Sequence, residues 1–401
     1  MKVFYQIGAN VYFFVVRVFS FWNPKAKLFI KGRQEANEKL KSFSPKGEVY
    51  WFHCASLGEF EQARPLIEAI KLKKKSNQIV ITFFSPSGYE IRKNYELADL
   101  VLYLPKDTTS NAIFLLDSLQ PKAIFFIKYE FWANYLLEAN TRKIPTYLVS
   151  GVFRKKQIFF KWYGGYMRKI LNSFSGIYLQ NTASKTLLDT INVKSVVTGD
   201  TRFDRVMKNA ETVNKFSEIE KFIDNKKCIV IGSCWAEDEQ VIFSTLNKRK
   251  DIKIIIAPHE IDEAHIKSIE IGLTKKSIRF SKINNSKSSR DFEVLIIDNI
   301  GMLMHLYQYA NVAYVGGAFG KGLHNILEPA SFGNPVIFGD KYSKFPEADE
   351  FLNAEIGFSI KNSTEFELIF NDLIVTDISA KVLTYMTSQK GATARIIKDI
   401  F

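Results

Sequence analysis

Short apolar runs alternate with longer amphipathic segments along most of the chain. The apolar runs are continuous, as in IVITFF and AIFFI, which is typical of strands that are covered on both faces. Strands separated by helix-length segments predict a parallel sheet with right-handed crossovers. In the first half we expect helices at Glu59–Lys74, Thr109–Leu119 and Glu130–Thr141, and strands at Val49–His53, Gln78–Phe84, Leu100–Leu104, Ala123–Ile127, Thr146–Val149, Gly176–Leu179 and Ser195–Thr198.

A second set of strands follows a polar stretch, Arg205–Lys227, that is rich in Lys, Glu and Asn. These strands are expected at Cys228–Gly232, Ile252–Ala257, Val294–Ile297, Val312–Gly316 and Pro335–Phe338. The pattern predicts two α/β domains, each a doubly wound parallel sheet, that face each other across a central cleft. We expect the first domain to span residues 24–210 and the second to span residues 211–401.

Residues 1–23 have a different character. Val3–Trp22 is dominated by aromatic and β-branched residues and is followed by the basic residues Lys25, Lys27, Lys31 and Arg33. Its length is borderline for a membrane span, which needs ~20 apolar residues. Aromatic residues at both ends and a basic cluster suit a helix that is held at the cytoplasmic side of a bilayer. We therefore expect a membrane-anchor helix here, and a buried N-terminal helix is the alternative.

The charge balance favours an anionic partner. The chain has 55 Lys and Arg against 42 Asp and Glu, a net charge of +13, which suits phosphate, nucleic acid or a membrane surface without choosing among them. An apolar content of 46% excludes a disordered chain. The 3 cysteines and 5 histidines are scattered, so they offer neither a zinc-ligand spacing nor a disulfide framework.

The first candidate motif joins the first expected strand to its helix. Ser56 and Gly58 lie in a tight strand-to-helix turn, which leaves backbone N–H groups free at the helix start. We expect Glu59 to point from this turn into the cleft, although it can equally serve only to complement the helix dipole. His53 and Cys54 are neighbours on a strand and point to opposite faces, so they are not a nucleophile and its base.

The second candidate motif is the glycine-rich loop Gly316–Gly322, which includes Gly317. Its glycine spacing and the lack of Ser or Thr after Lys321 exclude a Walker A loop, but a loop of this kind lets a phosphate approach closely. Glu328 is expected one turn into the following helix, where a carboxylate can accept both hydroxyls of a ribose. A flexible turn with a charge at a helix start is the alternative.

Two further positions end strands of the second domain. Ser233 follows the first of them, where a serine either caps the next helix or holds a phosphate, and Pro258 and His259 end the next strand. The chain contains no Asp-x-Asp, the pair with which many sugar-nucleotide enzymes hold a metal ion. A leaving phosphate would therefore be neutralised by helix dipoles, by side-chain donors and by N–H groups of the glycine-rich loop.

Together these segments resemble the Kdo transferases, glycosyltransferases of the GT-B fold that move 3-deoxy-D-manno-octulosonate (Kdo) from CMP-Kdo to a lipid A precursor. The matching stretches cover nearly the whole chain after residue 23 and include FHCASLGEFEQARPLI, YEFWAN, TGDTRFD and HNILEPA in this order. The combination is specific, although no single stretch is. The resemblance implies two Rossmann-like domains and a metal-independent, inverting transfer that needs no cofactor and releases CMP.

The resemblance also implies roles for single residues. Glu59 matches the family's general base, and Glu130 matches an acidic residue beside the acceptor. With a free pKa of ~4.3, Glu59 is expected to be ionised at neutral pH. Relatives commonly carry Arg where this chain has His259, so His259, Lys321 and Arg202 are the candidate partners of the phosphate. The family's contacts to cytidine monophosphate match Pro258, His259, Ile300, Gly301, Met302, Asn325, Ile326, Leu327 and Glu328.

The implied setting is lipopolysaccharide biosynthesis at the cytoplasmic face of the inner membrane, with CMP-Kdo, a lipid A precursor and an anionic phospholipid surface as partners. Basic and aromatic residues within residues 154–169 are expected to face that membrane, or else they form an ordinary solvated helix. Two other functions stay open. One is another GT-B glycosyltransferase or a nucleotide-sugar epimerase; the other, a nucleic-acid binder, is disfavoured because no nucleic-acid motif is present.

Overall fold

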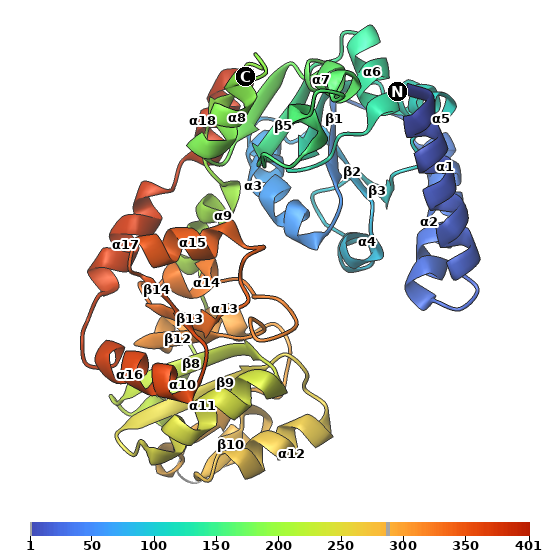
Figure 1. Cartoon of the computed structure of the whole chain (residues 1–401). Coiled ribbons are helices and arrows are strands. Elements are labelled where there is room, and N and C mark those ends of the chain that lie inside the picture. The colour runs from blue at the N-terminus through green and yellow to red at the C-terminus, as the bar shows by residue number, and fades with distance from the viewer. Residues whose placement is uncertain (1, 286–288) are drawn as a thin grey trace. The chain divides into compact units, whose positions relative to one another are not determined.

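The computed structural model describes residues 2–285 and 289–401. They form two compact units: unit 1 comprises Met1–Arg205 and Lys390–Phe401, and unit 2 comprises Val206–Gln389. The expectation that residues 211–401 form one domain is wrong at its end, since the last helix belongs to unit 1. In Figure 1 this helix, drawn in red, lies among the blue and green elements of unit 1. Its Ile396 is buried in the same hydrophobic core as strand residues of unit 1.

The sheet of unit 1 has seven parallel strands in the order β3-β2-β1-β4-β5-β6-β7. The strands are β1 (Val49–Cys54), β2 (Gln78–Phe83), β3 (Leu100–Tyr103), β4 (Pro121–Ile127), β5 (Thr146–Gly151), β6 (Gly176–Leu179) and β7 (Val196–Val197). The chain builds outward from β1 to β3 and then returns to the other side of β1 with β4. Ligands of such sheets bind outside the carboxyl ends of the strands at this reversal, here between β1 and β4.

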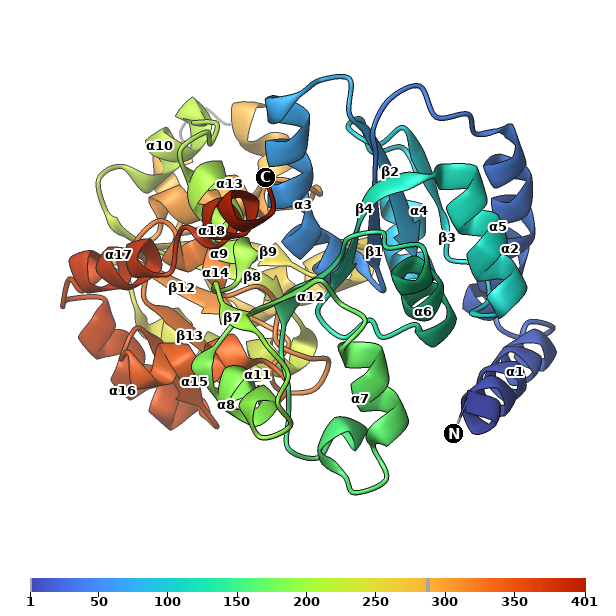
Figure 2. The same ribbon diagram turned by 90° about the horizontal axis from the view of Figure 1, so that it is seen from above.

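Helices cover both faces of this sheet, as the continuous apolar strands predict. Because neighbouring side chains point to opposite faces, Trp51 and Phe52 of β1 enter different cores, and both are completely buried. Figure 2 shows α2, α5 and α6 on one side of the sheet and α3 on the other. The helices of unit 1 are α1 (Lys2–Phe19), α2 (Pro24–Ser42), α3 (Leu57–Lys73), α4 (Pro86–Arg92), α5 (Thr109–Leu119), α6 (Ala133–Thr141), the 3-10 helix η1 (Ile158–Phe160), α7 (Gly165–Leu171), α8 (Thr182–Asp189) and α18 (Ala392–Ile400), while α9 (Thr201–Ala210) crosses into unit 2.

Helix α1 is docked on unit 1 rather than separate from it. The Tyr5 hydroxyl donates to Asp107 Oδ2 at 2.5 Å, and Phe13 packs on Phe29 with ring centroids 5.6 Å apart. Arg33, expected on the membrane-facing basic surface, is instead buried over the Phe29 ring at 3.5 Å. Within the described residues, no single helix has both the length and the apolar character to cross a membrane; Phe4–Phe19 and Pro24–Ser42, bent by 120°, meet that test only as a pair.

Unit 2 contains a second sheet of seven parallel strands, in the order β10-β11-β9-β8-β12-β13-β14. The strands are β8 (Lys227–Cys234), β9 (Ile252–Pro258), β10 (Ser277–Arg279), β11 (Val294–Ile296), β12 (Val312–Val315), β13 (Val336–Gly339) and β14 (Gly357–Ile360). The strand order reverses between β8 and β12, so the ligand site that this topology favours lies at the carboxyl ends of these two strands.

Helices again cover both faces of the second sheet. One core joins Ile229 and Ile231 of β8 to α11 and α16, and the opposite core joins Cys228 and Val230 to α10 and η4. The helices of unit 2 are α10 (Ser217–Ile223), α11 (Ala236–Lys248), α12 (Glu263–Gly272), α13 (Leu303–Leu306), α14 (Leu327–Ala330), α15 (Pro346–Asn353), α16 (Ser363–Leu373) and α17 (Ser379–Ser388), with the 3-10 helices η2 (Phe280–Asn285), η3 (Ser289–Asp291) and η4 (Tyr307–Tyr309).

Candidate active site

The residues singled out in the sequence lie at or after the carboxyl ends of strands in the two sheets, some of them at the topological reversals. In unit 1, the turn with Ser56, Gly58 and Glu59 follows β1, and Glu130 follows the neighbouring strand β4. In unit 2, the candidates follow β8, β9, β11 and β12. Parallel strands bring their carboxyl ends to one edge of a sheet. Each unit therefore assembles its own set of candidate side chains at one edge.

Glu59 closes the turn that starts α3. The helix begins at Leu57, two positions before the expected start, with Ser56 as its N-cap. Glu59 Oε2 accepts the backbone N–H of Ser56 at 3.1 Å and also that of Ala55. This reciprocal arrangement is a capping box, which satisfies N–H groups at a helix start. The Glu59 carboxyl group therefore complements the helix dipole and is at the same time the candidate catalytic group.

The environment of Glu59 favours its neutral form. Burial, and after it the negative charge of Glu130, together raise the pKa of Glu59 to about 8, against the lowering effect of the two backbone N–H groups and Lys128. The expectation that Glu59 is ionised at neutral pH is therefore wrong for the protein without substrate. A carboxyl group that titrates near neutrality is suited to take up and release protons.

Glu130 lies in the loop before α6, because that helix begins at Ala133 instead of the expected residue 130. Its Oε2 accepts hydrogen bonds from two side chains, Trp132 Nε1 at 2.6 Å and His53 Nε2 at 3.0 Å. Glu130 is only 8% exposed, and buried charges of this kind persist when donors compensate them. The two carboxyl groups of Glu59 and Glu130 thus form an interacting pair at the end of β1 and β4.

Arg202 is held by its own neighbour. Its Nη2 lies 2.7 Å from Asp200 Oδ2, its Nε donates to the same oxygen at 2.8 Å, and Gln62 of α3 donates to Asp200 as well. Burial is the largest single effect on the Asp200 carboxyl and raises its pKa, but the charge and hydrogen bonds of Arg202, with Lys128, together outweigh burial and hold the pKa below its ordinary value. Arg202 is therefore engaged in an ion pair within unit 1, which weakens its case as a partner of a phosphate.

Three strand ends carry backbone strain that the sequence did not reveal. Lys128, Ser150 and Ser233 have φ angles of 65°, 53° and 52°, in the left-handed region that residues with a side chain rarely adopt. They follow or end β4, β5 and β8 at the edges where the candidate residues lie. Such strain concentrates at functional sites because the surrounding structure must hold it. Ser233 does not cap α11, since the N-cap of that helix is Trp235.

The glycine-rich loop after β12 uses several of its N–H groups internally. Gly316 donates to Gly232 O at 2.9 Å, and Gly322 donates to Gly317 O at 2.8 Å. Gly317 donates to Asp238 Oδ2 at 2.9 Å. These groups are not free for a phosphate, contrary to the expectation for this part of the loop. Asp238, a completely buried residue of α11 that the sequence analysis did not single out, fixes the loop against the turn after β8.

An aromatic stack connects the ends of β8, β9 and β12. The ring of His259 lies 4.2 Å from Trp235 and 4.8 Å from His324, measured between centroids, and Trp235 Nε1 donates to His324 Nε2 at 3.2 Å. Lys321 Nζ lies 5.1 Å from the Trp235 ring centre. Burial and the proximity of His259 lower the pKa of His324 to about 4. Pro258 is buried, whereas His259 and Lys321 are exposed and can donate hydrogen bonds to a ligand at this edge.

The remaining nucleotide candidates lie on two short segments. Gly301 has a φ of 98°, Ile300 is 88% exposed, and Met302 caps α13. Glu328 lies in the first turn of α14, a helix of only 4 residues, and not one turn into a longer helix as expected. Asn325 donates to Glu328 Oε1 at 3.0 Å and accepts the N–H of Leu327, which holds this carboxylate in place, while the neighbouring Ile326 is buried.

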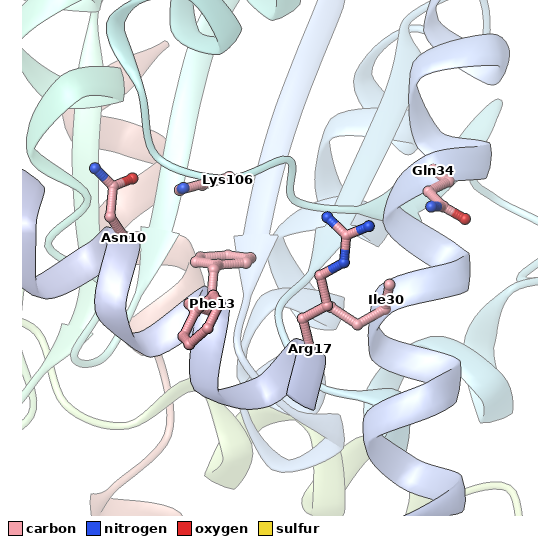
Figure 3. Close-up of a pocket in the computed structure, with 7 residues that line it drawn as sticks. Asn10, Phe13, Arg17, Ile30, Gln34 and Lys106 are labelled. Atoms are coloured by element: carbon pink, nitrogen blue, oxygen red, sulfur yellow. The ribbon is translucent and has the colours of Figure 1, made fainter. Parts of the chain in front are cut away.

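Two other features could take a ligand. A cavity of about 480 Å³ between α1 and α2 is lined by Asn10, Phe13, Phe14, Arg17, Ile30, Gln34 and Lys106 (Figure 3). Its charged lining is entirely cationic. Glu260, Asp262 and His265 place ligand-type atoms within 4.8 Å of one another, but both ring nitrogens of His265 are already engaged, with Glu260 O and Glu239 Oε1.

Comparison with known proteins identifies relatives over both units. Residues 30–205 match the family model described as 3-deoxy-D-manno-octulosonic-acid transferase (kdotransferase). A 3-deoxy-D-manno-octulosonic acid transferase of Aquifex aeolicus is 27% identical over 377 residues, which is 90% of this chain and 98% of the relative. A Chlamydia trachomatis protein of the same name is 26% identical over 388 residues, 92% of this chain and 84% of the relative. A bifunctional glycosyltransferase/methyltransferase of Fusobacterium nucleatum is 28% identical over 364 residues, 86% of this chain, and the chain spans 55% of that protein.

Solved structures share the architecture. The UDP-GlcNAc 2-epimerase of Neisseria meningitidis bound to UDP-GlcNAc matches 88% of this chain and 99% of its own, with a TM-score of 0.61 and 18% identity. MurG of Acinetobacter baumannii matches 88% and 99%, with a TM-score of 0.56 and 12% identity. At these identities the likeness shows the fold alone, and it confirms the expected GT-B class of two Rossmann-like domains. Residues 30–205 thus match the Kdo transferase family model, and the chain is similar over most of its length to proteins named 3-deoxy-D-manno-octulosonic acid (Kdo) transferase.

Proposed function

We propose that this protein transfers Kdo from CMP-Kdo to a lipid A precursor, with release of CMP, at the cytoplasmic face of the inner membrane. The observation that carries the proposal is the pairing of Glu59 with Glu130 at the reversal of the unit 1 sheet. The match of residues 30–205 to the Kdo transferase family model and the similarity to Kdo transferases support Kdo transfer in lipopolysaccharide biosynthesis. A carboxyl group that gains a proton near neutrality supplies the base which that transfer needs. Donor and acceptor identity are part of the proposal.

The proposed step is an inverting displacement. The acceptor hydroxyl oxygen forms a bond to the anomeric carbon of Kdo, while the bond from that carbon to the phosphate oxygen of CMP breaks on the opposite face. The hydroxyl proton goes to ionised Glu59, and the electron pair of the broken bond leaves with CMP. Because the transition state resembles an oxocarbenium ion, the negative charge of Glu130 beside Glu59 also favours the positive charge that develops on the sugar.

Unit 2 supplies the proposed donor site. Glu328, held by Asn325, is suited to accept the ribose hydroxyls, and His259 and Lys321 are the side-chain donors proposed for the phosphate. His259 thus takes the place of the Arg that relatives commonly carry. No metal ion or cofactor has a role in the proposal, since these side chains and the start of α11 can stabilise the leaving phosphate.

A membrane-facing surface of unit 1 supports the lipid acceptor. Helix α1 exposes an apolar stripe with helical spacing that includes Phe4, Ile7, Val11, Phe14 and Val18, of which Phe4 is 74% and Phe14 68% exposed. An apolar stripe on the outside of a docked helix is typical of a helix that lies in the membrane interface. Because Tyr5 and Phe13 fix the opposite side of α1 to unit 1, we propose that the helix lies in the interface without spanning the bilayer.

A second segment continues this surface. Trp162 is 91% exposed beside Tyr163 and follows exposed Lys155 and Lys156, and its segment leads into α7, whose Tyr166 contacts Tyr5 of α1 with ring centroids 6.3 Å apart. Interfacial aromatic residues and lysines suit an anionic leaflet. The cavity between α1 and α2, with Arg17, Lys106 and an aromatic wall, suits a negatively charged, partly apolar part of a lipid.

The deciding experiment is mass analysis of the product formed by purified protein from CMP-Kdo and a tetra-acylated lipid A precursor. The expected product is heavier than the acceptor by one or more Kdo residues, and CMP is released. Turnover of UDP-sugars in place of CMP-Kdo would show another glycosyltransferase or an epimerase. Salt-sensitive oligonucleotide binding without turnover of any nucleotide sugar would show a nucleic-acid binder instead.

A further inference from the structure

His53 lies at the end of β1 and has no part in the step described above. Its ring is completely buried beside Phe126 and Trp132, with centroids 5.7 Å and 5.9 Å away. Nε2 lies 3.0 Å from Glu130 Oε2, and Nδ1 lies 2.8 Å from Thr82 Oγ1. Both ring nitrogens are thus engaged where an unmade hydrogen bond is costly, so the ring fixes the position of its partners.

Chemistry assigns the donors around this ring. An indole N–H can only donate, so Thr82 Oγ1 accepts from Trp51 at 2.8 Å and Glu130 Oε2 accepts from Trp132 at 2.6 Å. A carboxylate can only accept, and therefore the proton between His53 and Glu130 belongs to Nε2. The Thr82 hydroxyl has one proton, which it can donate to Nδ1 at 2.8 Å or to the Phe52 carbonyl oxygen at 3.4 Å, and the shorter contact favours Nδ1. A continuous hydrogen-bonded chain then runs from Trp51 through Thr82 and His53 to Glu130.

This series of hydrogen bonds holds Glu130 through one of its carboxyl oxygens. Oε2 receives both His53 and Trp132, whereas Oε1 has no hydrogen-bond partner in the described part of the chain. The two donors offset the desolvation of a carboxylate that is only 8% exposed. The charge that they maintain acts on Glu59, whose pKa it raises in addition to burial. We therefore expect the loss of a donor to Oε2 to change the pKa of Glu59.

We propose that His53 is a positioning residue of the transfer reaction: its Nε2–H fixes the Glu130 carboxyl group in place, and Glu130 acts in turn on the proton-accepting carboxyl group of Glu59. The role rests on the proposed function, in which Glu59 takes the proton of the acceptor hydroxyl. His53 itself is buried and touches no substrate. It acts through Glu130, and its effect is measured as the pH at which Glu59 titrates.

Gln and Asn at position 53 form a matched pair of test variants. The amide nitrogen of Gln reaches the place of Nε2 and still donates to Glu130, whereas that of Asn reaches only the place of Nδ1, toward Thr82. The readout is the ¹³C NMR titration of carboxyl-labelled glutamate without any substrate, in which the Glu59 signal is the one lost in Glu59→Gln. We expect a midpoint near 8 in the wild type and in His53→Gln, and a midpoint lower by about one unit or more in His53→Asn and in Glu130→Gln.

An unchanged midpoint in His53→Asn would overturn the proposal, as would equal shifts in His53→Asn and His53→Gln, because His53 would then act only through packing. If His53→Asn does not fold, Trp132→Phe removes the other donor to the same oxygen; a lowered midpoint supports the proposal and an unchanged one overturns it. Tyr135→Phe is the stability control, since it loses one buried hydrogen bond in the same core, to Pro105 O at 3.0 Å. We expect it to lower Tm and leave the midpoint unchanged.

The titration separates this inference from the proposed function, because it needs neither CMP-Kdo nor acceptor. A midpoint that moves as expected in a protein without Kdo transfer activity would reject the proposed function and leave the link from His53 to Glu59 standing. Transfer activity with an unmoved midpoint would do the reverse. Where the enzyme is active, the acidic limb of its pH–rate profile should shift with the midpoint.

Discussion

Glu59 accepts the backbone N–H of Ser56 at 3.1 Å, so the carboxyl group proposed as the general base also closes the first turn of α3. The hydrogen bond holds the carboxyl group over the end of β1 in one orientation. A base that is fixed in this way needs no reorganisation before it takes a proton. The same contact means that substitutions of Glu59 must preserve the cap if chemistry alone is to be tested.

Glu59→Gln should abolish transfer and leave the fold intact. A Gln side chain at the third helical position still accepts the N–H of Ser56, but it cannot take a proton, so we expect a fall in kcat of about 10²–10⁴-fold. CMP affinity should be unchanged, and Tm should not fall below that of the wild type. Glu365→Gln is the matched control, because Glu365 accepts the N–H of Lys361 at the start of α16 at 2.9 Å; its activity should equal that of the wild type. Transfer by Glu59→Gln at the wild-type rate would remove Glu59 from the base role.

The stability of the protein should fall as the pH rises from 4.5 to about 8. Glu59 keeps its proton up to a pH of about 8 in the folded protein, whereas its ordinary value is 4.5. Between these values the folded state binds a proton that the unfolded state has released, so raising the pH favours unfolding by at most about 1.4 kcal/mol per unit. In urea unfolding measured from pH 5 to pH 9, the free energy of unfolding of Glu59→Gln should rise relative to that of the wild type as the pH increases through this range. Parallel stability curves would show that Glu59 is not held neutral.

Tyr5→Phe should loosen α1 from unit 1. The substitution removes the hydroxyl that donates to Asp107 and accepts the N–H of Ala133, so we expect a loss of about 1 kcal/mol and faster proteolysis near residue 20. Tyr12→Phe is the control, since the Tyr12 ring keeps its contacts with Phe29 and Phe84. Equal proteolysis of both variants would show that Tyr5 does not dock the helix.

Trp162→Ala should weaken binding to anionic vesicles. Burying a large apolar side chain is worth about 1.5–3 kcal/mol, so we expect about a tenfold loss in partitioning, measured by co-sedimentation with vesicles that contain phosphatidylglycerol. Leu368→Ala, at an equally open position of α16 in unit 2, is the control and should bind like the wild type. Unchanged binding by Trp162→Ala would show that this segment does not contribute to membrane binding.

The sheet was largely predictable because its strands are buried on both faces. The runs VYWF of β1 and AIFFI of β4 are apolar without interruption, and the expected and observed bounds of these strands differ by one or two residues. Two strands at or near sheet edges, β10 and β14, were missed, since Ser277–Arg279 and Gly357–Ile360 are short and half polar. The placement of α18 in unit 1 was also missed, because a helix pattern does not say which sheet it will cover.

The chemistry of the site was less predictable than its location. The Ser56 and Glu59 spacing is that of a capping box, but the raised pKa of Glu59 depends on Glu130, which comes from another strand. The same holds for Asp238, whose hydrogen bonds to Gly317 and Tyr314 join segments that are far apart in the chain. The strand order brings such groups together, and a local sequence pattern does not show how their charges will shift one another's pKa.

Gly317→Ala should abolish nucleotide binding through the shape of the loop. Gly317 has a φ of 94°, and a methyl group on its Cα would lie 2.3 Å from the carbonyl oxygen of Gly322, so the loop must open and its bond to Asp238 must weaken. Gly333→Ala is a matched control. Gly333 has a φ of 87°, and the atoms nearest to an added methyl group there belong to side chains, at 3.2 Å. We expect both variants to lose stability, by about 1–3 kcal/mol, and only Gly317→Ala to lose heat of CMP binding in calorimetry. Wild-type CMP affinity in Gly317→Ala would place the nucleotide site elsewhere in the protein.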